Sequence, residues 1–298
     1  MIISTRTAIH LVGLLSFPAL AQVPQTLVPI DESVAEVFQQ IASDERVHSS
    51  LQLIEAREPE NVREQFRITE IPAPPFQEER RAVYYLEQMR TRGLGDAYID
   101  TEGNAIGIRK GTGNGPTLLI AAHLDTVFPE DVDTTVELRG GRYYAPGIGD
   151  DTRGLAVLLS IIEVLNESGI ETVGDIIFSG NVGEEGRGDL RGIKAIFRDY
   201  PEIDGFISID GVQLRRITTG ATGSRRFEFH FKGPGGHSFG AFGLPSAIHA
   251  MGRAIAKISQ LETLPFPKTT FTVGTVEGGT SVNSIAADAT FAIDMRSN

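Results

Sequence analysis

Residue types that bind metals or move protons recur along this chain where apolar runs end. They are His123 and Asp125, Asp150 and Asp151, Glu184 and Glu185, and Asp210. Histidine nitrogen and carboxylate oxygen are ligands of zinc, and a carboxylate outside the ligand set can accept a proton. We therefore expect these residues to form a metal site with a proton-transferring group beside it.

Each of these signals has an ordinary structural explanation when taken alone. A histidine and an aspartate after the run from Thr117 to Ala122 form a common polar pair, and Asp150-Asp151 before an apolar helix can simply cap it. Glycines fence the Glu184-Glu185 pair, which otherwise reads as part of a solvated loop. Recurrence at four successive strand ends favours a site, because open α/β sheets gather ligand-binding residues at the carboxyl ends of their strands.

Amphipathic segments alternate with short apolar runs up to Asp210, a pattern that predicts a mostly parallel sheet covered by helices on both faces. Helices are expected at Asp31 to Arg67, Glu78 to Arg92 and Leu155 to Leu165. Strands are expected at Ala97 to Asp100, Asn104 to Lys110, Thr117 to Ala122, Asp175 to Ser179 and Gly205 to Ile209. A tight turn is expected at Gly140-Gly141.

The pattern changes after Asp210, which indicates a second domain. A strand, a helix and two further strands are expected at Arg225 to Lys232, Pro245 to Leu261, Thr269 to Val276 and Ala287 to Met295. This order is the opening of a ferredoxin-like α+β unit. His237 lies in a glycine-rich loop, which alone is more often a turn than a site, and His48, His230 and His249 match no motif.

Composition narrows the class of protein. The 298 residues carry a formal net charge of −12 and contain no cysteine, so nucleic acid is an unexpected partner and disulfides are excluded. Residues 1–21 combine Arg6, an apolar stretch from Ala8 to Leu20 and a small-residue cleavage site, which is typical of a signal peptide. The stretch is short for a bilayer span, so we expect a secreted or periplasmic protein without a membrane anchor.

The motif series as a whole resembles a known family. His-x-Asp, Pro-Gly-Ile-x-Asp-Asp, Gly-Glu-Glu-Gly and Ile-Asp-Gly, in this order and spacing, are similar to the two-zinc metallopeptidases and amidohydrolases that include peptidase T, carboxypeptidase G, aminoacylase and succinyl-diaminopimelate desuccinylase. The resemblance runs from about Ile71 to the last residue. It implies a zinc-exopeptidase-like α/β domain at 22–215 and an inserted, incomplete ferredoxin-like lid and dimerisation domain at 216–298.

The resemblance also implies roles for individual residues. It gives one zinc ion to His123 and Asp210 and the second to Glu185, with Asp150 shared between them and Co²⁺ or Mn²⁺ as alternative metals. Asp125 would orient His123, Glu184 would be the general base, and His237 and Asn283 would bind substrate. The family commonly has lysine two places after the shared aspartate, where this chain has Thr152, and Arg153 is the expected substitute.

The chemistry implied by these roles is amide hydrolysis. A water held by two zinc ions is acidified, a nearby glutamate takes its proton, and the metal pair polarises the scissile carbonyl. We expect an exported exopeptidase for small peptides that dimerises through its lid. An N-acyl amino acid deacylase, a lidless aminopeptidase and a non-catalytic peptide-binding relative stay open. The family's late histidine ligand has no counterpart after His249, so a truncated chain is expected.

Overall fold

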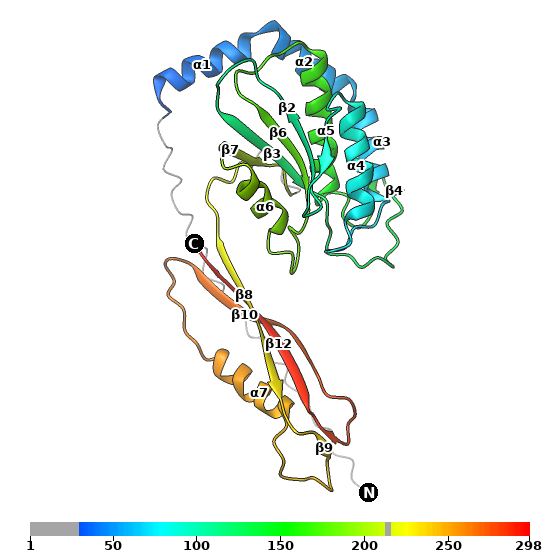
Figure 1. Ribbon diagram of the computed structural model, residues 1–298, viewed down its shortest axis with the longest axis vertical. Helices are drawn as coiled ribbons and strands as arrows, with labels where there is room; N and C mark the ends of the chain where they lie inside the picture. Colours follow the sequence, from blue (N-terminus) through cyan, green and yellow to red (C-terminus); the bar gives the residue numbers. More distant parts are fainter. Residues whose placement is uncertain (1–29, 212–215) are drawn as a thin grey trace, which may run out of the picture. The chain divides into compact units, whose positions relative to one another are not determined.

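A computed structural model describes residues 30–211 and 216–298 (Figure 1). The chain divides into two compact units, Met1–Val212 and Gln213–Asn298. The signal peptide expected at residues 1–21 lies outside the described residues. Within those residues, no helix combines the length and the apolar character that crossing a membrane requires.

The first unit is built on a five-stranded sheet in the order β1-β2-β6-β3-β7. Its strands are β1 (Tyr98–Ile99), β2 (Ala105–Arg109), β3 (Thr117–His123), β6 (Ile176–Asn181) and β7 (Ile203–Ser208). β3 pairs in parallel with both β6 and β7, as expected, whereas β1 and β2 form an antiparallel edge. A short turn joins β1 to β2, and such a turn can only connect antiparallel strands.

Helices cover both faces of this sheet (Figure 1). Side chains of β3 alternate between the faces: Ile120 packs with α4 (Glu79–Thr91) and α5 (Thr152–Glu167), and Leu119 packs with α6 (Arg191–Asp199). No element was expected where α6 lies. This short helix buries Gly192, Ala195 and Ile196 on one face, an amphipathic period that the sequence interpretation overlooked.

The single long helix expected at Asp31 to Arg67 is wrong, because the structure has three helices there. They are α1 (Glu32–Ser43), α2 (Glu45–Ala56) and α3 (Glu58–Thr69). Asp44 has extended backbone angles and its side chain accepts a hydrogen bond from Arg46 N at 2.8 Å, so it ends α1 and caps α2. Pro59 stands in the first turn of α3, where a missing N–H costs nothing.

The second unit is an antiparallel sheet in the order β10-β12-β8 with one helix against it. Its elements are β8 (Gly223–Lys232), α7 (Ala247–Ile258), β10 (Thr269–Gly278) and β12 (Asp288–Ser297), in the order expected of the α+β unit. The short strands β9 (Gly236–His237) and β11 (Ser284–Ile285) pair with each other beside it. In the first unit, β4 (Glu137–Arg139) and β5 (Arg142–Tyr144) form the hairpin that turns at Gly140-Gly141, as expected.

Candidate metal centre

The carboxyl ends of β3, β6 and β7 meet at one edge of the sheet of the first unit. β3 ends on His123, the loop after β6 carries Glu184 and Glu185, and Asp210 follows β7. The sequence predicted a fourth strand end at Asp150 and Asp151, and this prediction was wrong. Both residues come from the loop that leads into α5. This loop brings both carboxylates back to the edge where His123 lies.

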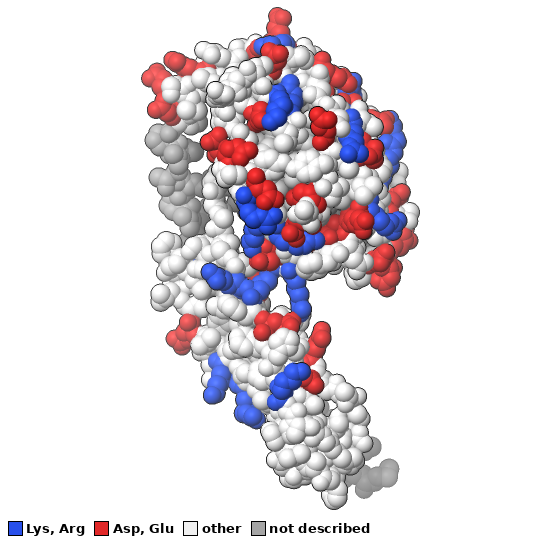
Figure 2. Space-filling model, viewed as in Figure 1, with Lys and Arg blue, Asp and Glu red and all other residues white. Residues whose placement is uncertain are grey.

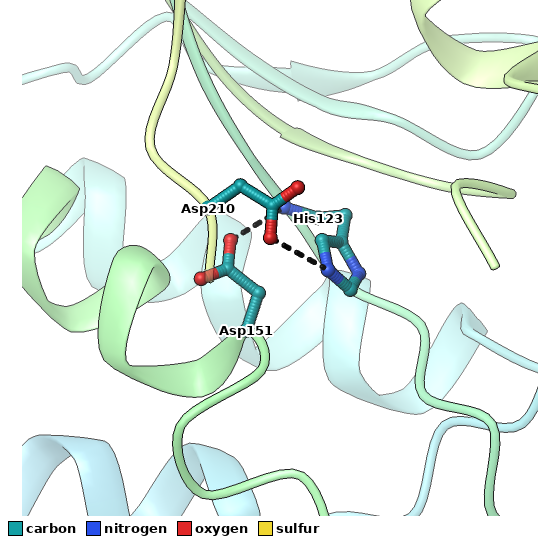
Figure 3. A group of neighbouring side chains, drawn as sticks. All are labelled: His123, Asp151 and Asp210. Atoms are coloured by element: carbon teal, nitrogen blue, oxygen red, sulfur yellow. Dashed lines mark hydrogen bonds and ion pairs between the residues drawn. The ribbon is translucent and has the colours of Figure 1, made fainter. Parts of the chain in front are cut away.

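His123 is the centre of the cluster and is almost fully buried. Its Nε2 atom lies 3.0 Å from Asp150 Oδ1 and 3.8 Å from Asp210 Oδ1. Figure 3 shows the ring between the β3 end and the Asp210 carboxylate, with Asp151 beside it. Two groups of ligand atoms share this histidine, each with its atoms within 4.8 Å of one another: one adds Asp151 and Asp210, the other Asp150 and Glu185. The structure thus brings together every ligand that the sequence suggested.

Asp125 contacts both His123 and the loop that carries Glu184 and Glu185. Its backbone oxygen lies 2.9 Å from His123 Nδ1, nearer than its carboxylate, which is 3.7 Å away. The carboxylate accepts hydrogen bonds from the backbone N–H groups of Glu184 at 3.1 Å and Glu185 at 2.8 Å. The expected orienting contact is therefore made mainly by the Asp125 main chain. With Nδ1 protonated against that carbonyl, Nε2 is free to bind a metal.

Asp151 takes the helix-capping role that the sequence offered for the Asp150-Asp151 pair. It is buried, caps α5 through a 3.1 Å hydrogen bond from Gly154 N, and accepts another at 3.1 Å from His123 N. A Cβ at position 154 would lie 2.3 Å from Asp151 Oδ1, so only glycine leaves room for this cap. Burial raises the pKa of Asp151 to about 8. Both oxygens thus serve the fold, whereas the Asp150 carboxylate is half exposed and faces His123.

The electrostatics of the cluster favour a cation. Burial opposes a charge on His123, but the hydrogen bonds to Asp125 and Asp150 outweigh it and raise its pKa to about 11. Burial raises the pKa of both Glu184 and Glu185. The carboxylates gathered around one imidazole carry an excess of negative charge, and the oxygens of Asp150, Glu185 and Asp210 with one histidine nitrogen form a donor set that suits zinc. The residues present therefore fit a divalent metal.

Without metal, the first unit is expected to lose stability as the pH rises from 6.5 to about 8. In this window unfolded His123 has lost its proton while the folded side chain keeps it up to about 11. Asp151, ionised above 3.8 when unfolded, stays protonated in the fold up to about 8. The folded state binds more protons at both positions, so each lowers the free energy of unfolding by up to about 1.4 kcal/mol per pH unit.

Denaturant titrations in EDTA across this pH window would measure the slope. Asp151→Asn should remove about half of it. Added zinc should oppose it, because metal binding releases the His123 proton. A free energy of unfolding that is flat or rises with pH in EDTA would contradict the protonated states of His123 and Asp151 in the fold.

Two buried polar side chains, both missed by the sequence interpretation, hydrogen-bond to the backbone of segments that carry the cluster. Arg81 of α4 donates to Leu124 O at 2.6 Å and to Ile71 O at 2.9 Å, and burial lowers its pKa to about 10. Asn104 accepts from Val182 N at 3.0 Å and donates to Gly192 O at 3.1 Å. It thereby holds together the two ends of the loop that carries Glu184. Arg81 stands in the buried stripe of α4, four residues before Tyr85, and a charged residue there was a signal that the interpretation overlooked, whereas Asn104 gave none.

His237 and Asn283, the two residues expected to bind substrate, lie together in the second unit. Nδ1 of His237 accepts from Phe239 N at 3.2 Å and Gly240 N at 3.3 Å, which leaves Nε2–H as the outward donor. Asn283 O accepts from Ser238 N at 2.9 Å. Residues 233–252 around His237 contain no Lys, Arg, Asp or Glu, in keeping with the uncharged end of the second unit in the view of Figure 2, and Phe239 is exposed there.

Arg153 does not take the place of the family's lysine. Its Nη2 atom is 2.9 Å from Glu58 Oε1 on α3, and Nη1 is 3.5 Å from Gln65 Oε1. The side chain is therefore committed to α3, and the expectation that it serves the Asp150 loop as lysine would is wrong.

Comparisons with known proteins agree with this architecture. Residues 119–213 match peptidase family M20/M25/M40, and residues 219–298 match a peptidase dimerisation domain. Carboxypeptidase G2 of Pseudomonas sp. (strain RS-16) is 28% identical over 206 residues, which cover 65% of this chain and 47% of that protein. A Pyrococcus abyssi (strain GE5 / Orsay) protein named as a LysW-lysine/LysW-ornithine hydrolase is 32% identical over 162 residues, 54% of this chain and 43% of that one.

Solved structures show the same fold. The YXEP protein of Bacillus subtilis, described as a dinuclear metal binding peptidase, matches with a TM-score of 0.53 at 17% identity, over 82% of this chain and 65% of that one. The chain spans about half the length of the curated relatives it matches.

Proposed function

Because this chain belongs to peptidase family M20/M25/M40, we propose that it is a metal-dependent hydrolase of amide bonds that acts as an exopeptidase on small peptides. The observation that carries the proposal is the convergence of His123, Asp150, Glu185 and Asp210 beside a glutamate that is not needed as a ligand. Ligands alone would suit a binding protein, but a spare, partly buried carboxylate suits proton transfer.

We propose that the site binds two zinc ions, with Co²⁺ or Mn²⁺ as alternative metals. His123 Nε2 and Asp210 would hold one ion, Glu185 the other, and Asp150 would be shared. When bound, zinc would lower the pKa of a coordinated water and polarise the scissile carbonyl. The family resemblance supports this assignment, and so does the group that His123 forms with Asp150 and Glu185, whereas the group with Asp210 contains Asp151 in place of Asp150.

Glu184 is the proposed general base. Its backbone N–H is fixed by Asp125, and burial raises the pKa of its carboxyl, which brings it nearer to the range where a carboxylate accepts a proton efficiently at neutral pH. It would take the proton of the attacking water and deliver it to the leaving amine. His237 Nε2–H and Asn283 are proposed to bind the substrate's polar groups.

A second candidate is hydrolysis of N-acyl amides. A Bacillus subtilis relative named N-formyl-4-amino-5-aminomethyl-2-methylpyrimidine deformylase, 28% identical over 181 residues, favours it. The purified protein should be assayed with di- and tripeptides and with N-acyl amino acids, before and after EDTA treatment. Peptide turnover that EDTA abolishes and zinc restores is expected. Turnover of N-acyl amino acids alone would favour the second candidate, and EDTA-insensitive turnover would contradict the metal.

Two properties of the whole protein complete the proposal. The match of residues 219–298 to a dimerisation domain supports a homodimer formed through the second unit, which a monomer in sedimentation would contradict. The sequence of residues 1–21 supports export to the periplasm or the medium, and a mature N-terminus other than Gln22 would contradict cleavage there.

A further inference from the structure

Thr152, at the start of α5, is completely buried and makes polar contacts on two sides. Its Oγ1 atom lies 3.0 Å from Gly147 O and 3.1 Å from Ile148 O, two carbonyls of the loop that carries Asp150. The same atom is 2.7 Å from the hydroxyl of Thr69, the last residue of α3. A hydroxyl has one proton and two lone pairs, so Thr152 donates to one of the two carbonyls when it accepts from Thr69, whose hydroxyl also has Gln65 O as an acceptor at 2.7 Å.

A second side chain of α3 hydrogen-bonds to this loop directly. Gln65 donates from Nε2 to Ile148 O at 2.5 Å. Gln65 and Thr69 are four residues apart and so lie on one face of the helix. Thr69 is fully buried and Gln65 is 9% exposed, so water has little access to replace either contact. We call Gln65, Thr69 and Thr152 the α3 lock.

The position of Asp150 depends on this backbone. Its half-exposed side chain contacts His123, and that contact changes when a metal displaces the His123 proton. Ile148 and Gly147 stand two and three residues before it. Fixing their carbonyls therefore fixes where the Asp150 carboxylate is presented, whatever occupies the site.

We propose that the α3 lock positions Asp150 as a metal ligand. The inference rests on the proposed function, since it concerns the metal that function requires. The three residues are positioning residues: each acts through the loop backbone and none reaches the ligand cluster itself.

Thr152→Val and Thr69→Val test the lock, because each keeps the shape of the side chain and removes the hydroxyl. Zn²⁺ affinity, measured by competition with a chromophoric chelator, should fall about 10- to 100-fold, the range typical when a partner of a metal ligand is lost. Thr152→Ser, which restores the hydroxyl, should bind zinc within about threefold of the unsubstituted protein, a narrower change than that range.

Ser160→Ala is the matched control. Ser160 is also a buried hydroxyl of α5 bound to α3, through Asn61 Nδ2 at 3.0 Å, but it lies about two turns away from the loop. Its loss should lower stability comparably and leave zinc affinity unchanged. In metal-free protein, amide hydrogen exchange at residues 147–151 should be faster in both valine variants and unchanged in Ser160→Ala.

The outcomes separate the two levels of inference. Valine variants that bind zinc like Ser160→Ala, with unchanged exchange at residues 147–151, would overturn the lock and leave the proposed function standing. An unsubstituted protein that binds no divalent metal would overturn both. If a valine variant does not fold, Gln65→Leu removes the donor to Ile148 O, together with the 3.5 Å contact to Arg153, and puts the lock to the same measurements.

Discussion

Replacing Glu184 with glutamine is expected to lower kcat for the amide substrate by about 10²- to 10⁴-fold while the protein keeps its full complement of metal. Glutamine has nearly the same shape and can still hydrogen-bond, but it cannot take a proton from water. The hydrogen bond that Asp125 accepts from the backbone N–H of residue 184 does not involve the side chain, so the loop should keep its place.

Steady-state kinetics together with metal analysis of the same preparation would measure this. Glu185→Gln is the matched comparison, because it changes the neighbouring residue on the same loop but removes a ligand. It should lose metal as well as activity. If the Glu184→Gln enzyme keeps a tenth or more of kcat, Glu184 is not the general base. If the enzyme loses metal, Glu184 is a ligand instead.

The second large effect is expected from Asp150→Asn. Asparagine offers one neutral oxygen where the carboxylate offered two charged ones, so it cannot hold two cations together. Zinc affinity should fall by more than the 10- to 100-fold typical of residues that only support a ligand. Stoichiometry should drop from two ions per chain to one or none.

Asp151→Asn separates the two adjacent carboxylates. Asparagine is a good helix N-cap and can keep the bond from Gly154 N, so α5 should be preserved and zinc affinity should change by less than about tenfold. Both variants would be titrated with zinc by calorimetry. If Asp151→Asn abolished binding and Asp150→Asn did not, the ligand that groups with His123 and Asp210 would be Asp151.

The part of the site that could be predicted from sequence is the part that local sequence patterns indicate. Buried strands are short apolar runs, and a histidine or a carboxylate at their end is visible without any knowledge of packing. The candidate residues were identified in this way, whereas the choice of four ligands and a base came from the family resemblance, and the structure brings all five to one edge of the first unit. The order of elements in the second unit followed from the same alternation.

What could not be predicted depends on contacts between distant segments. Thr69 and Thr152 meet across 83 positions, and Asn104 reaches Val182 across 78, and in each case the sequence shows only an ordinary polar residue. The break of one expected helix into α1, α2 and α3 was missed for a different reason. A helix cap and a helix interior share the same amphipathic period, so the period alone does not show where Asp44 leaves the helix.

The parallel pairing of β3 with β6 and β7 has a consequence for how the protein folds. Parallel neighbours are joined by long crossovers, so the ends of these strands meet only after large loops have closed, and closing such loops is slow. His123, Glu185 and Asp210 are therefore far apart in the unfolded chain, which has no preformed site for the metal. Metal would bind the finished sheet and not its precursors, so it would slow unfolding and leave the rate of folding almost unchanged.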